Sequence, residues 1–386
     1  MSPRSATQVV LLTPEGRGAV ASLLVEGPQA LEFVAELFHP AHGRSLADTP
    51  SGKIVFGRWQ LSDRGEELIV CRRDVQRIEI HCHGGHIAAT AIVASLVERG
   101  CRAVAWRQWI SESVQDPIAA AAQIALAGAS TERTAGMLWD QATGALRRAL
   151  DTIAAQIEAG QSELAACGVD ALIERSALGC HLVAPWRVVL AGRPNVGKSS
   201  LINALLGYRR AIVHETPGTT RDVVTAVAAF EGWPVELADT AGLHESTDPL
   251  EISGMRLTHQ RLSTADLAVL VFDASRGDSA DDKRLASRWP EALRVFNKCD
   301  LMSSESSISG RPPGLHVSAL RGEGLGELEH EIAARLVPRV PARRSGVPFT
   351  AKQVESLTQI RAALASDDPD AAGQLLSRAE SWGSDC

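Results

Sequence analysis

Residues 192–199, Gly-Arg-Pro-Asn-Val-Gly-Lys-Ser, have the spacing of a loop that holds the phosphates of a nucleotide. Glycines let successive backbone amides converge on phosphate oxygens, and the N-terminus of a following helix adds partial positive charge. Lys198 is predicted to reach the β and γ phosphates, and Ser199 to bind Mg²⁺. A chance match is the alternative. The other predicted nucleotide contacts of this loop are Asn195, Val196, Gly197 and Ser200.

Residues 216–222, Thr-Pro-Gly-Thr-Thr-Arg-Asp, follow at the place where a nucleotide-dependent switch segment is expected. Thr219 and Thr220 are predicted nucleotide contacts. Thr220 can close over Mg²⁺ and the γ phosphate, so we assign it to the metal site and to catalysis. A simple turn is the alternative interpretation of this run.

A carboxylate follows the short apolar strand expected at residues 235–238. Asp239 begins the sequence Asp-Thr-Ala-Gly, and at the end of a strand it can hold Mg²⁺ through water. Gly242 can then offer its amide to the γ phosphate. The expected Mg²⁺ site therefore combines Ser199, Thr220 and Asp239.

The sequence Asn297-Lys298-Cys299-Asp300 follows an apolar strand expected at residues 293–296. Asp300 can accept two hydrogen bonds from guanine, and adenine cannot supply that pair. Ser318 and Ala319, after residues 315–317, match a last base-contacting loop. Because these elements follow successive strands of one α/β block, they predict a domain that binds GTP rather than ATP.

Composition sets broad limits on the rest of the chain. With 386 residues, two or three domains are expected. A net charge of −7 argues against a surface that binds nucleic acid throughout, so any RNA contact should be local. Seven scattered cysteines indicate neither a disulfide framework nor a zinc site, which fits a reducing cytosol. No secretory leader or membrane-spanning apolar run is evident, so we expect a cytoplasmic protein without a membrane partner.

The pattern of apolar residues predicts four parts. Residues 1–110 form an α+β domain, 111–183 are helical, 184–340 form an α/β domain, and 341–386 add short helices. We expect strands at 9–12, 20–25, 54–61, 67–71, 76–81, 187–191 and 223–230. We expect helices at 30–38, 86–99, 200–206, 350–363 and 370–380, and amphipathic helices within 134–164.

The α/β block resembles the MnmE (TrmE) family of tRNA-modification GTPases, which implies a Ras-like P-loop fold. The resemblance also implies that this block is inserted in a helical domain of reduced size, formed by residues 111–183 and 341–386. The resemblance rests on Asn195, on Gly-Thr-Thr-Arg-Asp at 218–222, and on Leu243 where Ras-like enzymes carry glutamine. It implies a K⁺ ion held by Asn195 and by backbone carbonyls between Thr216 and Gly218. It also implies that Glu251 orients the attacking water through a bridging water; a solvated carboxylate at a helix cap is the alternative.

The resemblance extends to residues 13–19 and 78–85, which are similar to the family's folate-binding domain. It implies a homodimer formed through this domain and a bound formyl-tetrahydrofolate. The chain departs from the family pattern at residues 71–75 and 105–109.

A metal site at His81, His83 and His86 is a further alternative. Cys386 lacks the Ile-Gly-Lys that follows the family's C-terminal cysteine, so we interpret it as an exposed thiol.

We therefore expect an enzyme that hydrolyses GTP to GDP and phosphate in the modification of tRNA wobble uridine. The family resemblance implies an MnmG-type flavoprotein and tRNA as partners. One alternative is a regulatory GTPase that has lost the modification chemistry. Another is a ribosome-assembly GTPase of the Era or Der kind, which shares the Gly-Thr-Thr-Arg sequence but not the His-Gly-Gly sequence of the N-terminal part.

Overall fold

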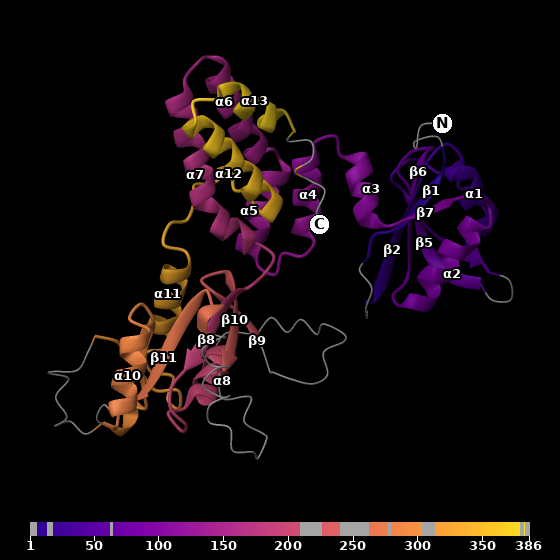
Figure 1. Cartoon of the computed structure of the whole chain (residues 1–386). Coiled ribbons are helices and arrows are strands. Elements are labelled where there is room, and N and C mark those ends of the chain that lie inside the picture. Colours follow the sequence, from indigo (N-terminus) through magenta and orange to yellow (C-terminus); the bar gives the residue numbers. More distant parts are fainter. Residues whose placement is uncertain are drawn as a thin grey trace, which may run out of the picture. The chain divides into compact units, whose positions relative to one another are not determined.

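The computed structural model describes residues 6–13, 18–61, 65–208, 226–239, 262–276, 279–302, 313–378 and 382. These residues form two compact units, Met1–Gln115 and Asp116–Cys386. Figure 1 shows the elements of both units.

Among the described residues of the first unit, seven strands form one sheet in the order β3-β4-β5-β6-β2-β1-β7. Its neighbouring strands are antiparallel, except that β1 and β7 are parallel. The strands are β1 (Gln8–Leu11), β2 (Val20–Glu26), β3 (Phe38–Pro40), β4 (Ile54–Gln60), β5 (Gly65–Arg72), β6 (Arg77–His83) and β7 (Arg102–Val104).

Alternation along the strands decides which face of this sheet is covered. In β6, Ile78, Ile80 and Cys82 are buried while the residues between them are not. They join one core with residues of α1 (Ala30–Leu37) and α2 (His86–Val97). A smaller cluster packs α3 (Trp106–Ser113) on β1, β2 and β7.

Five elements of the first unit differ from the sequence-based expectation. The helix expected at 30–38 ends at Leu37, and Phe38 begins β3. The helix expected at 86–99 ends at Val97. The elements β3, β7 and α3 were not predicted. Strands of three residues are too short to show periodicity, and α3 has no buried residue that would mark an apolar face.

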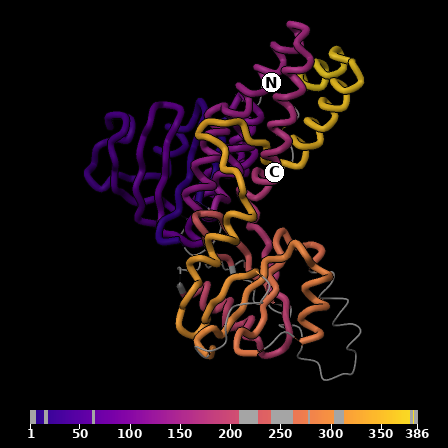
Figure 2. Tube along the Cα trace, turned by 90° about the vertical axis from the view of Figure 1, so that its left-hand side faces the viewer, coloured from indigo at the N-terminus to yellow at the C-terminus, as the bar shows by residue number. Residues whose placement is uncertain are grey.

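The second unit contains a group of helices from both ends of its sequence. They are α4 (Pro117–Leu126), α5 (Glu132–Ala142), α6 (Ala145–Glu158), α7 (Ser162–Cys180), α12 (Ala351–Ala365) and α13 (Pro369–Ser377). α12 packs against α7, and α13 packs against α6 (Figures 1 and 2). Thr350 caps α12 and exchanges hydrogen bonds with Gln353, which explains where that helix begins. The final segment therefore returns to the helices that precede the α/β sheet.

Gln141 attaches the returning segment to α5. The side chain is 1% exposed. Its Nε2 donates to the carbonyl of Ser345 at 3.1 Å, and its Oε1 accepts from the amide of Val347 at 3.1 Å. One buried amide thus satisfies a donor and an acceptor of a connection that has no regular structure of its own.

In the described part of the α/β block, six strands form a sheet in the order β13-β12-β11-β8-β10-β9, with β9 antiparallel to β10 and the other pairs parallel. The strands are β8 (Trp186–Ala191), β9 (Ala226–Phe230), β10 (Trp233–Asp239), β11 (Leu267–Asp273), β12 (Leu293–Asn297) and β13 (Leu315–Val317). The remaining elements are α8 (Lys198–Tyr208), α10 (Ala280–Arg288), the short 3-10 helix η2 (Cys299–Leu301) and α11 (Leu325–Leu336).

Helices cover both faces of this sheet. Val188 and Leu190 of β8 share one core with apolar residues of α8 and α11, whereas Val189 and Ala191 belong to a cluster that includes Leu285 of α10. The chain winds in both directions from β8, since β10 and β11 flank it. In such sheets, ligands bind where the strand order reverses, at the carboxyl ends of the strands.

We expect Gln141→Leu to lower the free energy of unfolding by about 2 kcal/mol, because the Ser345 carbonyl and the Val347 amide would lose their buried partner. Urea denaturation of the full chain measures this loss. Gln359→Leu, on the exposed face of α12, is the matched control and should change the free energy by less than about 0.5 kcal/mol. Equal effects of the two substitutions would contradict the role of Gln141.

Candidate nucleotide-binding site

The loop between β8 and α8 has the backbone of a phosphate-binding loop. Asn195 and Gly197 have φ angles of 64° and 92°, in the left-handed region. A Cβ added to Gly197 would overlap Nδ2 of Asn297, so a side chain has no room there. The loop ends at Lys198, where α8 begins, so the partial positive charge of that helix N-terminus lies directly after the loop.

Lys198 lies inside this loop. The residue is 5% exposed. Its Nζ donates to the carbonyls of Gly192 at 3.1 Å and Arg193 at 3.2 Å. Burial lowers the pKa of the Lys198 amine, and the nearby Asp239 carboxylate acts in the opposite direction. Loop carbonyls therefore hold the ammonium at the place where the sequence predicts phosphate contacts.

Two of the predicted Mg²⁺ ligands meet at the same edge of the sheet. Ser199 Oγ donates to Oδ2 of Asp239 at 2.6 Å, which joins the start of α8 to the end of β10. A hydroxyl and a carboxylate supply the hard oxygen donors that Mg²⁺ prefers. These two residues fit the ion.

Asn297 connects the phosphate loop to the loops after β12 and β13. The residue is 2% exposed. Its Nδ2 donates to the Val196 carbonyl at 3.0 Å, and its Oδ1 accepts from the Ala319 amide at 3.1 Å. The predicted phosphate and base segments are therefore one connected structure.

The residues predicted to bind guanine also lie together. Ser318 Oγ donates to Oδ1 of Asp300 at 2.6 Å. Ser318 is buried, and its carbonyl accepts from the amide of Gly322 at 2.8 Å. Because the carboxylate of Asp300 is oriented by this hydroxyl, it can present its oxygens to a base.

Six predicted site residues lie outside the described residues. They are Thr216, Gly218, Thr219, Thr220, Gly242 and Glu251. The predicted switch segment, the K⁺ carbonyls and the residue expected to orient water therefore stay predictions. Among the described site residues, Asn195 and Ser200 are exposed, and Val196 is buried beneath the loop.

Sequence reasoning missed Asp273, the last residue of β11. Its Oδ2 accepts from Nζ of Lys298 at 2.7 Å, and the same Nζ donates to the carbonyl of Asn195 at 2.7 Å. The signal was present in the sequence, since an acidic residue directly follows the apolar run at residues 267–272. Asp239, which we predicted, has the same position at the end of β10.

In the first unit, the two segments that resemble the folate-binding domain line a hollow of about 100 Å³. Thr13 and Gly18 come from one segment, and Gly84, Gly85 and His86 from the other or directly after it. A Cβ on Gly84 would overlap the carbonyl of Gly18, so this close approach requires glycine.

The three histidines weighed as a metal site have separate hydrogen-bond partners. Nδ1 of His81 pairs with Ser22 Oγ at 2.9 Å, Nδ1 of His83 with Glu66 Oε1 at 2.6 Å, and Nδ1 of His86 with Thr90 Oγ1 at 3.1 Å. Within the residues that the structure describes, no three His, Cys, Asp or Glu side chains form a group that could hold a metal ion.

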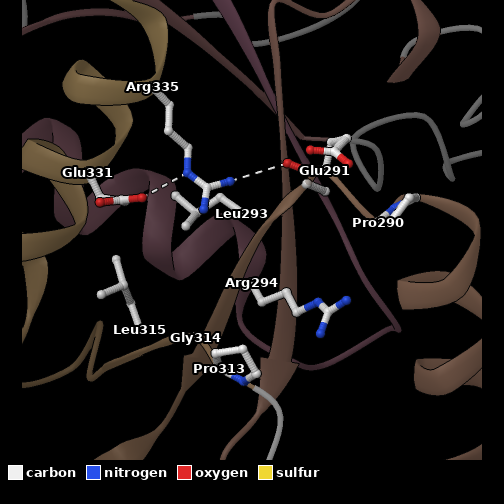
Figure 3. Close-up of a pocket in the computed structure, with 10 residues that line it drawn as sticks. Pro290, Glu291, Leu293, Arg294, Pro313, Gly314, Leu315, Glu331 and Arg335 are labelled. Carbon is white, nitrogen blue, oxygen red and sulfur yellow. Dashed lines mark hydrogen bonds and ion pairs between the residues drawn. The ribbon is translucent and has the colours of Figure 1, made fainter. Parts of the chain in front are cut away.

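A larger hollow, of about 460 Å³, lies at the other end of β12 and β13, away from Asn297. Figure 3 shows Arg335 reaching the carboxylate of Glu331 at 2.8 Å and the carbonyl of Glu291 at 3.2 Å. The size of a hollow therefore does not identify the candidate nucleotide site, which is built from loop amides and charged side chains.

Of the described helices, none is both long and apolar enough to cross a membrane.

Comparison with known proteins agrees with this site. A family model described as a 50S ribosome-binding GTPase matches residues 187–298. The tRNA modification GTPase MnmE of Symbiobacterium thermophilum is 32% identical over 376 residues, which cover 85% of this chain and 82% of that protein. The MnmE of Moorella thermoacetica is 31% identical over 373 residues, covering 84% and 81%. The solved G domain of the T. maritima FeoB iron transporter is 28% identical, covers 39% of this chain and 98% of that chain, and gives a TM-score of 0.29.

The similarity to the MnmE proteins extends over both compact units and is not confined to the α/β block. The GTPase family model covers the phosphate loop, the strand that ends at Asp239, and Asn297. The chain therefore belongs to the tRNA modification GTPase MnmE family.

Proposed function

We propose that this protein hydrolyses GTP to GDP and phosphate in the modification of tRNA wobble uridine. The proposal that it is a GTPase rests on one observation. Loops at one edge of the sheet hold Lys198, the Ser199–Asp239 pair and the Asp300–Ser318 pair, and Asn297 joins these loops. Family membership supports the tRNA part.

In the proposed reaction, Lys198 exchanges its loop carbonyls for the β and γ phosphate oxygens and stabilises the charge that builds on them. Ser199, Asp239 and Thr220 hold Mg²⁺, which when bound neutralises the same charge. Thr219 and Gly242 contact the γ phosphate, and Glu251 orients the attacking water. Positioning and electrostatics supply most of the catalysis in phosphoryl transfer.

We also propose a K⁺ ion beside the phosphates, held by Asn195 and by backbone oxygens at Thr216 and Gly218. The exposed Asn195 side chain at the rim of the phosphate loop supports this role. A cation at this place would supply the positive charge that an arginine finger provides in other GTPases.

Guanine selection is assigned to Asp300, with Ser318 and Ala319 beside it. The Ser318 hydroxyl uses one lone pair of Oδ1 and orients the carboxylate, so its two oxygens can accept from guanine N1 and N2. Asn297 and Lys298 hold the base segment against the phosphate loop.

For the rest of the chain, we propose the domain division at residues 110, 183 and 340, with the α/β domain inserted in the helical domain. The packing of α12 and α13 on α7 and α6 supports it. The first domain would mediate a cytoplasmic homodimer, and the hollow beside Gly84 could receive part of a formyl-tetrahydrofolate. An MnmG-type flavoprotein and tRNA would be the partners.

Asp300→Asn should weaken GTP binding by about 100-fold and leave the affinity for xanthosine triphosphate unchanged or higher, because the amide pairs with the additional carbonyl of xanthine. Titration with fluorescent analogues of both nucleotides measures the two dissociation constants. Asp151→Asn, on the exposed side of α6, is the control and should bind GTP normally. Unchanged GTP affinity in Asp300→Asn would contradict guanine recognition by this residue.

GTP hydrolysis should be at least about tenfold faster in KCl than in NaCl at equal ionic strength. Asn195→Ala should remove this difference while GDP still binds. Phosphate release in single turnover is the measurement, and the dissociation constant of GDP in each salt is the control. Equal rates in the two salts would show that K⁺ takes no part.

Mass spectrometry of tRNA nucleosides tests the cellular role. A strain lacking this chain should lose the modified wobble uridine and regain it when the unaltered gene is returned. A gene encoding Lys198→Ala should fail to restore it. An unchanged nucleoside profile, together with measurable GTP hydrolysis by the purified chain, would favour the regulatory GTPase.

A further inference from the structure

We propose that Asp273 is a positioning residue for the bound nucleotide: it holds Lys298 against the carbonyl of Asn195 and so fixes the phosphate loop to the base-binding segment. This inference rests on the proposed binding of guanine nucleotides. It adds a residue from β11, a strand to which the sequence assigned no part in the site.

The position of Asp273 follows from the register of the sheet. Asp273 pairs with Asn297 across β11 and β12, so its side chain is next to the start of the base-binding segment. Its carboxylate accepts from Nζ of Lys298 at 2.7 Å, and that Nζ donates to the Asn195 carbonyl at 2.7 Å. One ammonium group therefore bridges β11 and the phosphate loop.

The carboxylate of Asp273 is itself held in place. Its Oδ1 accepts from the backbone amide of Ser275 at 3.0 Å and from the Ser275 hydroxyl at 2.6 Å. The side chain is 11% exposed, so solvent screens the ion pair only partly. Burial raises the pKa of Asp273, but the hydrogen bonds from Lys298 and Ser275 outweigh burial and hold it below the usual value. The group is thus a fixed anion.

The bridge joins two residues in a disfavoured backbone conformation. Asn195 and Lys298 have φ angles of 64° and 67°, in the region that residues other than glycine rarely occupy. Such conformations persist where surrounding contacts hold them. The hydrogen bond from Lys298 Nζ to the Asn195 carbonyl is a contact of this kind, and Asp273 keeps the ammonium aimed at that carbonyl.

Fixing the Asn195 carbonyl also orients an amide. In a trans peptide the carbonyl and the next N–H point in opposite directions, so holding the Asn195 oxygen directs the Val196 N–H the other way. Asn297 holds the Val196 carbonyl in the same manner and directs the N–H of Gly197. Asp273 acts through Lys298 on the Val196 amide, and Asn297 acts on the Gly197 amide. Together they preorganise two successive amides of the loop for phosphate oxygens.

The test is the affinity of the full chain for GDP, measured by titration with a fluorescent GDP analogue. Asp273→Asn keeps the shape of the side chain but removes its charge, and should raise the dissociation constant about tenfold. The ratio of the constants for inosine diphosphate and GDP should change less than about twofold, because Asp300 still reads the base. A role in guanine selection would change this ratio and overturn the proposal.

Asp266→Asn is the matched control. Asp266 lies before the first residue of β11, and its Oδ2 accepts from the amide of Arg187 at 2.7 Å, at the opposite end of the strand from Lys298. Both variants should melt within a few degrees of each other, but only Asp273→Asn should lose GDP affinity. Equal losses of affinity would show a general effect on the sheet and overturn the proposal.

A double variant tests whether Asp273 acts through Lys298. Lys298→Met should weaken GDP binding by at least as much as Asp273→Asn, and adding Asp273→Asn to it should cause little further loss, because the shared interaction is already gone. If the fold-losses of GDP affinity in the two single variants multiply in the double variant, Asp273 acts independently of Lys298, and the proposal is overturned. If the unaltered chain binds no GDP, the proposed function fails with this inference; if it binds GDP and Asp273→Asn binds equally well, only the inference fails.

Discussion

The nucleotide site depends on one buried amide, the side chain of Asn297. It donates to the Val196 carbonyl and accepts from the Ala319 amide, so it holds together the loops that follow β8, β12 and β13. Asn297 is 2% exposed, and its removal would leave the Val196 carbonyl buried without this partner, which typically costs about 1–3 kcal/mol. The same amide occupies the space above Gly197, which explains why that position has no side chain. The loops proposed to bind the phosphates and the base are therefore joined by one side chain.

The sheet order makes this coupling possible. Since the parallel strands β8, β10, β11, β12 and β13 all end at one edge, their following residues converge there. Asp239 and Asp273 occupy equivalent strand ends, and each carboxylate meets a group from the phosphate loop or the base segment, Ser199 and Lys298 respectively. Apolar strands thus form the frame, and a few charged residues at their ends supply the chemistry.

The helical part of the second unit is assembled from segments that lie before and after the α/β block in the sequence. α12 and α13 return to α7 and α6 from beyond the α/β block (Figure 2). Gln141 ties the returning connection to α5. These contacts join the two ends of a unit whose middle contains the α/β sheet.

From the sequence we could predict the phosphate loop, Asp239, the Asn297–Asp300 segment and most strands of both sheets, because these features are contiguous and their residue types act through local spacing. β7 has too few residues for a period to show, and α3 has no buried residue to mark an apolar face. The tertiary structure alone decided that Asp273 meets Lys298, 25 positions away, and that Gln141 meets Val347, 206 positions away. The sequence around a single polar residue does not show which distant residue it will hydrogen-bond. The register of β11 and β12 brings Asp273 to Lys298, and the return of α12 and α13 to the earlier helices brings Val347 to Gln141.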